Sequence, residues 1–266
     1  MVFRRLSTIA LPVAFALAGL AGCGSGTPAT SASSAPAASA GGAAGQVTVF
    51  AAASLTGTFT ELGKSFESAH PGTTVRFNFG SSATLAQQIV QGAPADVFAA
   101  ASPATMKTVT DASLAGAPAT FVRNRLQIAV PAANPAKVDE LKDLADPAVK
   151  VALCAEQVPC GAAAVKALGA AGLKVTPVTL EQDVKATLTK VQLGEVDAAL
   201  VYRTDVIASG GKVTGIDFPE AAQAVNDYPI AALAKAPAGA LAKQFVDLVL
   251  SQQGKDVLAR AGFEAP

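Results

Sequence analysis

Two stretches of the chain, 49-VFAAASLTGTFTEL-62 and 78-NFGSSATLAQQIVQG-92, place serine hydroxyls where an apolar strand pattern changes to a helical one. Ser54 and Ser82 stand at these turns, and neither stretch contains lysine, arginine, histidine or cysteine. A helix N-terminus offers unpaired N–H groups and a partial positive charge. An added hydroxyl therefore makes an anion site without a cationic side chain. An isolated serine in such a turn is more often a plain helix N-cap, and that alternative stays open.

Two further stretches, 159-PCGAAAVKAL-168 and 182-QDVKATLTKV-191, begin helices, and 198-AALVY-202 ends a strand on Tyr202. Four helix starts and one phenol would surround an anion with neutral donors only. Asp183 is a candidate acceptor for a protonated anion, but its place before Val184 favours a helix N-cap. The pattern indicates capture of an anion, not catalysis.

The elements that must position these residues alternate along the chain from Gln46 onwards. Leu55, Phe59, Leu62 and Phe66 recur at spacings of 4, 3 and 4, which marks one face of a helix. Near-continuously apolar strands that alternate with helices predict an α/β fold with parallel sheets covered on both faces. Ligands of such sheets bind beyond the carboxyl ends of the strands. Strands are expected at 47–52, 75–79, 96–100, 126–130, 149–153, 174–178 and 198–202, and helices between them and at 238–251 and 255–260.

The composition argues against several function classes. Lysine plus arginine and aspartate plus glutamate number 20 each, so there is no positive excess for a nucleic-acid partner. Tryptophan is absent and aromatic residues make up 5%, too few for a platform that stacks bases or sugars. The roughly 220 residues after position 45 are enough for one large domain or two small ones.

The first residues, 1-MVFRRLSTIALPVAFALAGLAGC-23, have the pattern of a secretory signal, with two arginines before an apolar run that ends in small residues. The closing LAGC resembles the bacterial lipobox and predicts lipidation of Cys23, with an ordinary signal peptide and a chance cysteine as the alternative. We expect a lipoprotein signal peptide over 1–22 and a flexible Ala/Ser/Gly/Pro tether over 23–45. The rest of the chain would lie outside the cytoplasmic membrane, held to it by lipid.

Cys154 and Cys160 lie close together in 153-LCAEQVPCG-161. An even pair in an oxidising compartment predicts a disulfide, which would contribute about 2 kcal/mol by constraining the unfolded chain. Two buried free thiols are the alternative. Zinc is not favoured, because the only histidine, His70, lies in the turn 70-HPG-72.

Five runs together resemble the periplasmic molybdate-binding proteins of ABC transporters: VFAAASLTGTF, FGSSATLAQQIVQGAPADVFAAAS, VPCG, QDVKATL and ALVY. The resemblance extends from Gln46 to Phe263 and is densest over 49–102. It implies a two-lobed type II periplasmic-binding-protein fold, in which two α/β domains joined by two hinge crossings hold the ligand in the cleft between them. Lobe I is expected at 46–125 and 225–266, and lobe II at 126–224.

The resemblance also implies a set of binding residues. Ser54 and Ser82 would bind the oxyanion through hydroxyl and amide from lobe I. Lobe II would add the amides of Cys160 and Val184 and the hydroxyl of Tyr202. Cysteine at position 160 departs from the alanine that is more usual there, but its main-chain amide is still available. If Cys160 is bonded to Cys154, that amide would be better preorganised.

The implied function is that of a solute-binding lipoprotein that captures molybdate, and tungstate of nearly the same size, for an ABC-type permease with a cytoplasmic ATPase. No enzymatic activity and no cofactor are expected. We expect a monomer that contacts the membrane only through its lipid. Fully deprotonated molybdate offers only acceptors, whereas hydrogen phosphate would need an acceptor from the site. Sulfate or another tetrahedral oxyanion is the alternative ligand, and cavity size would decide between them.

Three other classes fit the sequence less well. A serine hydrolase built on Ser54 or Ser82 needs a positioned base, and the chain has a single histidine and no G-x-S-x-G elbow. A ferric-ion binder would want several tyrosine, histidine or carboxylate ligands, but Tyr202 and Tyr228 are the only tyrosines. Tyr228 is expected to pack where the chain crosses back to lobe I. A purely structural surface lipoprotein would not explain donors at four helix starts.

Overall fold

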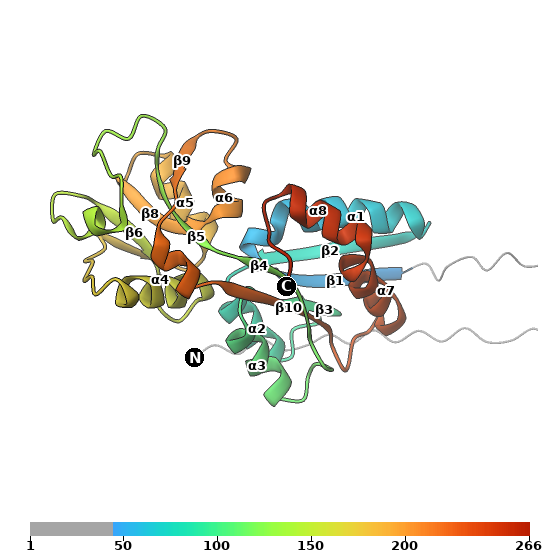
Figure 1. Cartoon of the computed structure of the whole chain (residues 1–266). Coiled ribbons are helices and arrows are strands. Elements are labelled where there is room, and N and C mark those ends of the chain that lie inside the picture. Colours follow the sequence, from blue (N-terminus) through green and yellow to red (C-terminus); the bar gives the residue numbers. More distant parts are fainter. Residues whose placement is uncertain (1–44) are drawn as a thin grey trace, which may run out of the picture. The chain divides into compact units, whose positions relative to one another are not determined.

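The computed structural model describes residues 45–266, which form two five-stranded sheets with helices packed on them (Figure 1). The predicted signal peptide and Cys23 lie outside the described residues. The first sheet has the strand order β2-β1-β3-β10-β4, and the second has the order β7-β6-β8-β5-β9. The strands are β1 (Gly45–Ala52), β2 (Thr73–Gly80), β3 (Val97–Ala99), β4 (Ala119–Asn124), β5 (Leu126–Pro131), β6 (Val151–Cys154), β7 (Thr179–Glu181), β8 (Ala198–Tyr202), β9 (Val213–Ile216) and β10 (Asn226–Ala232).

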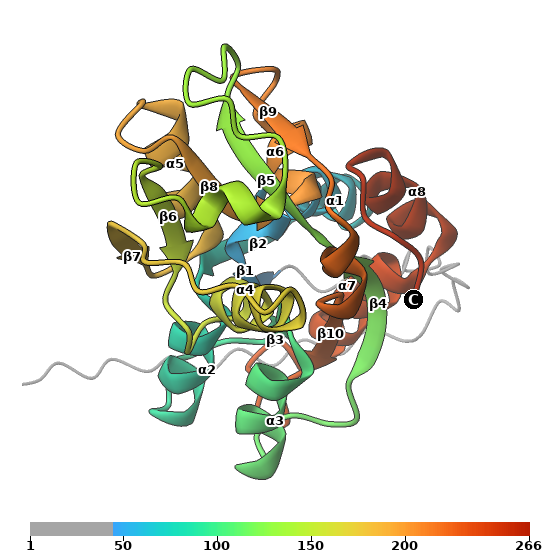
Figure 2. The same cartoon turned by 60° about the vertical axis from the view of Figure 1, so that its left-hand side comes forward.

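Helices cover both faces of the first sheet (Figures 1 and 2). Strand β1 shows why: Val49 and Ala51 pack into one apolar cluster, and Phe50 packs into another on the opposite face. Phe59 and Phe245 lie in the first cluster, and Met106 lies in the second. The first face carries α1 (Thr56–Ala69), α7 (Gly239–Leu250) and α8 (Gln252–Arg260), and the second carries α2 (Ser82–Val90) and α3 (Pro103–Asp111).

The second sheet has a core of its own, in which Ile128, Val151 and Leu200 are fully buried. Its helices are α4 (Pro159–Ala170), α5 (Val184–Gln192) and α6 (Arg203–Ala208), with short 3₁₀ turns η2 (Leu141–Ala145) and η3 (Pro219–Gln223). No helix in the described part of the chain has the length and hydropathy of a membrane span.

The chain passes between the two sheets twice. The first passage runs from β4 into β5 through Arg125 alone, and the second runs from η3 into β10 (Figures 1 and 2). Strands β4 and β10 are antiparallel neighbours, and Asn124 at the end of β4 pairs with Asn226 at the start of β10. The two crossings therefore lie side by side.

The expectation of parallel sheets was wrong, because both sheets are mixed. Strand β10 runs antiparallel to β3 and β4, and β5 runs antiparallel to β8 and β9. The strand on which the chain enters the second sheet, β5, and the strand on which it returns to the first, β10, each run against their neighbours. The strands expected at 47–52, 75–79, 126–130 and 198–202 are confirmed.

The strand expected at 174–178 was also wrong. This segment is irregular, and the strand in that region is the short β7 that follows it. Pro177 lies within the expected strand and has no N–H to donate to a ladder, which disfavours strand pairing there.

Helix α4 approaches the segment after β6 very closely at Gly161. A Cβ atom at this position would collide with main-chain atoms of Ala155, including its carbonyl oxygen. Because main chain cannot yield as a flexible side chain does, only glycine fits here. The same helix contains Gly169, where a Cβ would meet nothing within 4 Å.

We predict that Gly161→Ala lowers the free energy of unfolding by about 1–3 kcal/mol, the usual cost of overpacking. Gly169→Ala, the matched control in the same helix, should be neutral or stabilising by up to about 1 kcal/mol, because alanine favours the helix. Urea unfolding followed by circular dichroism measures both variants. Equal stability of the two variants would contradict the close approach of α4.

Candidate functional site

A pocket lies where four helix starts meet the end of β8. The structure brings together there all five residues that the sequence suggested for the site, two beside the first sheet and three beside the second. Among the described residues that form its wall there is no lysine, arginine or histidine. The wall consists of Ala52, Ala53, Ser54, Gly80, Ser81, Ser82, Ala101, Val158, Pro159, Cys160, Asp183, Val184 and Tyr202.

The two serines come from adjacent strands of the first sheet. Ala52 at the end of β1 pairs with Gly80 at the end of β2, so Ser54 and Ser82 follow neighbouring carboxyl ends. Ser82 is 2% exposed, and its Oγ accepts a hydrogen bond of 3.0 Å from the Ala101 N–H. Because this bond occupies a lone pair, the Ser82 proton is left for another acceptor.

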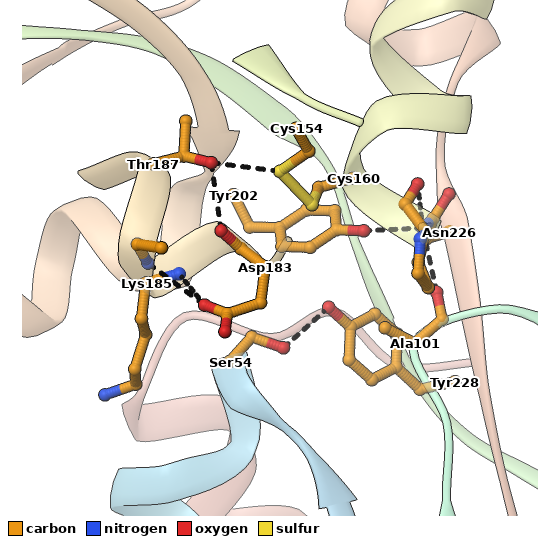
Figure 3. Close-up of a disulfide and its surroundings, with 12 residues drawn as sticks. Ser54, Ala101, Cys154, Cys160, Asp183, Lys185, Thr187, Tyr202, Asn226 and Tyr228 are labelled. Atoms are coloured by element: carbon orange, nitrogen blue, oxygen red, sulfur yellow. Dashed lines mark hydrogen bonds between the residues drawn. A yellow bond between two sulfur atoms is a disulfide. The ribbon is translucent and has the colours of Figure 1, made fainter. Parts of the chain in front are cut away.

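Ser54 meets a tyrosine and does not cap a helix. Its Oγ lies 3.0 Å from Tyr228 Oη (Figure 3). The N-cap positions of α1 and α2 are Leu55 and Ser81, and neither has a side-chain cap bond. The N-cap alternative for Ser54 and Ser82 is therefore wrong, because both hydroxyls are engaged elsewhere.

The second sheet contributes two helix N-termini. Pro159 opens α4 and has no N–H, so Cys160 carries the first main-chain donor of that helix. Cys160 is joined to Cys154 by a disulfide (Figure 3). In α5, Asp183 Oδ1 accepts from the N–H groups of Lys185 and Ala186, at 2.9 and 3.0 Å. The N-cap role expected for Asp183 is confirmed, and the cap leaves the Val184 N–H uncommitted.

Tyr202 ends β8 and is 1% exposed. Its Oη accepts a hydrogen bond of 2.7 Å from Asn226 Nδ2 (Figure 3). Burial raises the pKa of the Tyr202 hydroxyl well above its usual value, and Tyr228 and Asp205 add to that shift. The phenol therefore keeps its proton at neutral pH and can donate it.

Three contributors to the site escaped the sequence analysis. Asn226 bonds to Tyr202, and Ala101 bonds to Ser82. Tyr228 bonds to Ser54. Tyr228 does pack at the crossing as expected, edge-on to Phe121, Tyr202 and Phe263. Its hydroxyl contact could not be read from local sequence, because Ser54 lies 174 positions away.

Among the residues that the structure describes, the pocket wall offers donors but no histidine to act as the base for a nucleophilic serine. His70 lies at the end of α1, where its ring stacks on Phe66 and its Nδ1 lies 2.9 Å from the Phe66 carbonyl. It is not part of the pocket wall. In residues 45–266 no group of three histidine, cysteine or acidic residues is placed to hold a metal ion. Such a pocket can bind an acceptor-rich anion.

Comparison with known proteins agrees with this arrangement. The model of the family described as bacterial extracellular solute-binding protein matches residues 47–264. The chain belongs to this family. It is 44% identical over 254 residues to the molybdate-binding protein ModA of Mycobacterium tuberculosis strain H37Rv, a match that covers 95% of each chain.

Two solved structures show the fold shared by this solute-binding protein. The periplasmic molybdate-binding protein of Azotobacter vinelandii superposes with a TM-score of 0.72 at 23% identity, covering 83% of this chain and 99% of the other. The sulfate-binding protein SubI from M. tuberculosis H37Rv gives a TM-score of 0.70 at 18% identity, covering 83% and 86%. The two-lobed periplasmic-binding-protein fold expected from the sequence is confirmed.

A buried carboxyl lies beside Tyr202 in this solute-binding protein. Asp205 in α6 is 4% exposed, and within the described residues its Oδ2 has no hydrogen-bond partner. Burial raises its pKa to about 7, against the opposing effects of Lys185 and the Tyr202 main-chain N–H, while Asp183 adds to the rise. In the unfolded chain the same carboxyl ionises near pH 4. Unfolding therefore releases a proton between about pH 4 and pH 7. The stability that this carboxyl contributes is complete below that window and is lost as the pH rises through it.

We predict that Asp205→Asn makes stability less dependent on pH. Relative to the unaltered protein, the variant should gain about 3 kcal/mol in unfolding free energy between pH 4.5 and pH 8, because it has no carboxyl to ionise. Urea unfolding at the two pH values measures the difference. Asp111→Asn, an exposed change in α3, is the control and should show no such gain. The same effect of Asp205→Asn at both pH values would contradict the raised pKa.

Proposed function

We propose that this solute-binding protein captures molybdate, and tungstate with it, outside the cytoplasm and delivers the anion to an ABC-type permease. The observation that supports this most directly is the pocket, in which Ser54, Ser82, Cys160, Val184 and Tyr202 offer hydroxyl and amide donors. Within residues 45–266, no lysine, arginine or histidine lines it. The 44% identity to the ModA of M. tuberculosis supports the same ligand.

The chemistry of molybdate suits donors that are neutral. The dianion carries no proton near neutral pH, so all its oxygens accept hydrogen bonds. Burying such a charge is costly unless those oxygens are satisfied, and bonds from N–H and O–H to an anion belong to the strong class. Hydrogen phosphate would need an acceptor from the site. Asp183 Oδ1 accepts the two cap bonds of α5, so in this pocket only the Oδ2 atom of that carboxylate is left for such a role.

Sulfate is the second candidate ligand, because it is also a deprotonated tetrahedral dianion. The fold resembles that of the sulfate-binding protein SubI, at 18% identity. Donor chemistry alone does not separate the two anions, so selection must come from the size of the closed cavity. The higher identity to ModA favours molybdate.

In our proposal the two crossings act as a hinge. Lobe I would comprise residues 46–125 and 225–266, and lobe II residues 126–224. The passages at Arg125 and before β10 leave few main-chain links between the sheets, so rigid-body closure is the expected motion. The disulfide at Cys160 would hold its N–H in place for the closed state. A lipid on Cys23 and the tether over 23–45 would keep the monomer beside the permease and its cytoplasmic ATPase.

Isothermal titration with molybdate, tungstate, sulfate and phosphate tests the proposed function. We expect tight binding of molybdate and tungstate and much weaker binding of sulfate and phosphate. Sulfate affinity equal to that of molybdate would move the proposal to a general oxyanion carrier. Absence of binding by all four anions would overturn it.

We predict that Ser82→Ala weakens molybdate binding by about 1.5–3 kcal/mol, the range for a hydrogen bond to a charged group. The control is Ser251→Ala, which removes the N-cap hydroxyl of α8, outside the pocket. That change should lower stability by about 1 kcal/mol and leave the affinity unaltered. Unchanged affinity of the Ser82→Ala variant would mean that the anion binds elsewhere.

A further inference from the structure

Asn226, the first residue of β10, bonds to pocket elements of both sheets. Its Nδ2 lies 2.7 Å from Tyr202 Oη and 2.8 Å from the Ala101 carbonyl oxygen (Figure 3). The Pro159 carbonyl oxygen lies 3.4 Å from the same nitrogen. Asn226 is 7% exposed and is not part of the pocket wall. Asn226 therefore contacts one proposed donor directly, Tyr202, and two main-chain carbonyls of the pocket wall.

The orientation of this amide follows from its partners. The two main-chain carbonyls can only accept, so the amide nitrogen of Asn226, and not its oxygen, must face them. The nitrogen has two protons, and its two short bonds go to Ala101 and Tyr202. Tyr202 Oη thus receives a hydrogen bond, and its own proton can go to an acceptor. The Tyr228 hydroxyl is one such acceptor within the protein, and a bound anion would be another.

The side-chain amide of Asn124, at the other crossing, is oriented in the same way, with its nitrogen toward hydroxyl groups. Asn124 is the cross-strand partner of Asn226, and its Oδ1 accepts from the Arg125 N–H at 3.1 Å. Its Nδ2 then faces Thr204 Oγ1 at 2.8 Å and Tyr228 Oη at 3.5 Å. With a lone pair of Tyr228 engaged by Asn124, the Tyr228 proton can go to Ser54. Both asparagines thus direct donors toward the site.

We propose that Asn226 is a positioning residue that turns the Tyr202 hydroxyl proton toward the bound oxyanion. The proposal rests on the proposed function, because it assumes that Tyr202 binds the anion. A hydroxyl that already accepts from Asn226 has its proton available for the ligand and one acceptor site fewer to offer. Asn226 thereby favours a ligand made entirely of acceptors over one that carries a proton. Since its bonds span the two sheets, the orientation is complete only when Tyr202 and Ala101 are held together.

A double-mutant cycle tests this role. Asn226→Leu and Tyr202→Phe are made singly and together, and molybdate affinity is measured by isothermal titration. Where Tyr202 is intact, we expect Asn226→Leu to weaken molybdate binding by about 10-fold or more. This is the effect of losing one hydrogen bond to a charged group, here the bond from Tyr202 to the anion. In the Tyr202→Phe background it should weaken binding by less than about 2-fold, because no hydroxyl remains to be oriented. Equal losses in both backgrounds would overturn the proposal.

Two controls separate this role from general damage. Asn78→Leu makes the same substitution on β2, where the Asn78 side chain bonds to Gln88 outside the pocket, and it should leave affinity unchanged. Failure of the unaltered protein to bind molybdate would overturn the proposed function and this proposal with it. Normal binding by that protein with additive losses would overturn the role of Asn226 alone.

A measurement on the unaltered protein covers the case in which Asn226→Leu does not fold. The side-chain amide protons of Asn226 are assigned by nuclear magnetic resonance through their contacts with Ala101 and Tyr202. On addition of molybdate they should shift and exchange more slowly with water, whereas those of Asn78 should not. Asn226 amide signals that neither shift nor exchange more slowly when molybdate is added would overturn the proposal.

Discussion

A dianion that leaves water must have its oxygens hydrogen-bonded by the protein, because bare burial of charge costs more than other contacts recover. In this chain the requirement falls on neutral groups, since the pocket wall in residues 45–266 has no cationic side chain. Neutral donors suffice only if they already point at the ligand. Helix starts fix the N–H groups of Cys160 and Val184, and accepted hydrogen bonds leave the protons of Ser82 and Tyr202 free.

The architecture follows from that requirement. Helix N-termini gather at the carboxyl ends of strands, and segments that follow strands of both sheets line the pocket. The chain passes twice between the sheets at adjacent positions, where Asn124 and Asn226 pair across β4 and β10. The crossings therefore serve both as the connection between the sheets and as support for the hydroxyls behind the pocket.

Most of the proposed site residues could be predicted from the sequence, because each lies at a pattern that is visible in a short stretch of the chain. Ser54, Ser82, Cys160 and Val184 follow strand-to-helix transitions, and Tyr202 ends an apolar strand, so each is visible within a short window. The strands at 119–124, 213–216 and 226–232 and the role of Asn226 were not visible in this way. They depend on pairing between segments far apart in the chain, such as Asn226 with Tyr202 and Ala101, and no local periodicity encodes that register.

The most direct test of the account is a crystal structure grown with molybdate, in which anomalous scattering locates the metal centre. We expect the centre between the two sheets, with its oxygens hydrogen-bonded to the hydroxyls of Ser54, Ser82 and Tyr202 and to the N–H groups of Cys160 and Val184. A centre remote from these residues, or one held by lysine or arginine side chains, would contradict capture by neutral donors.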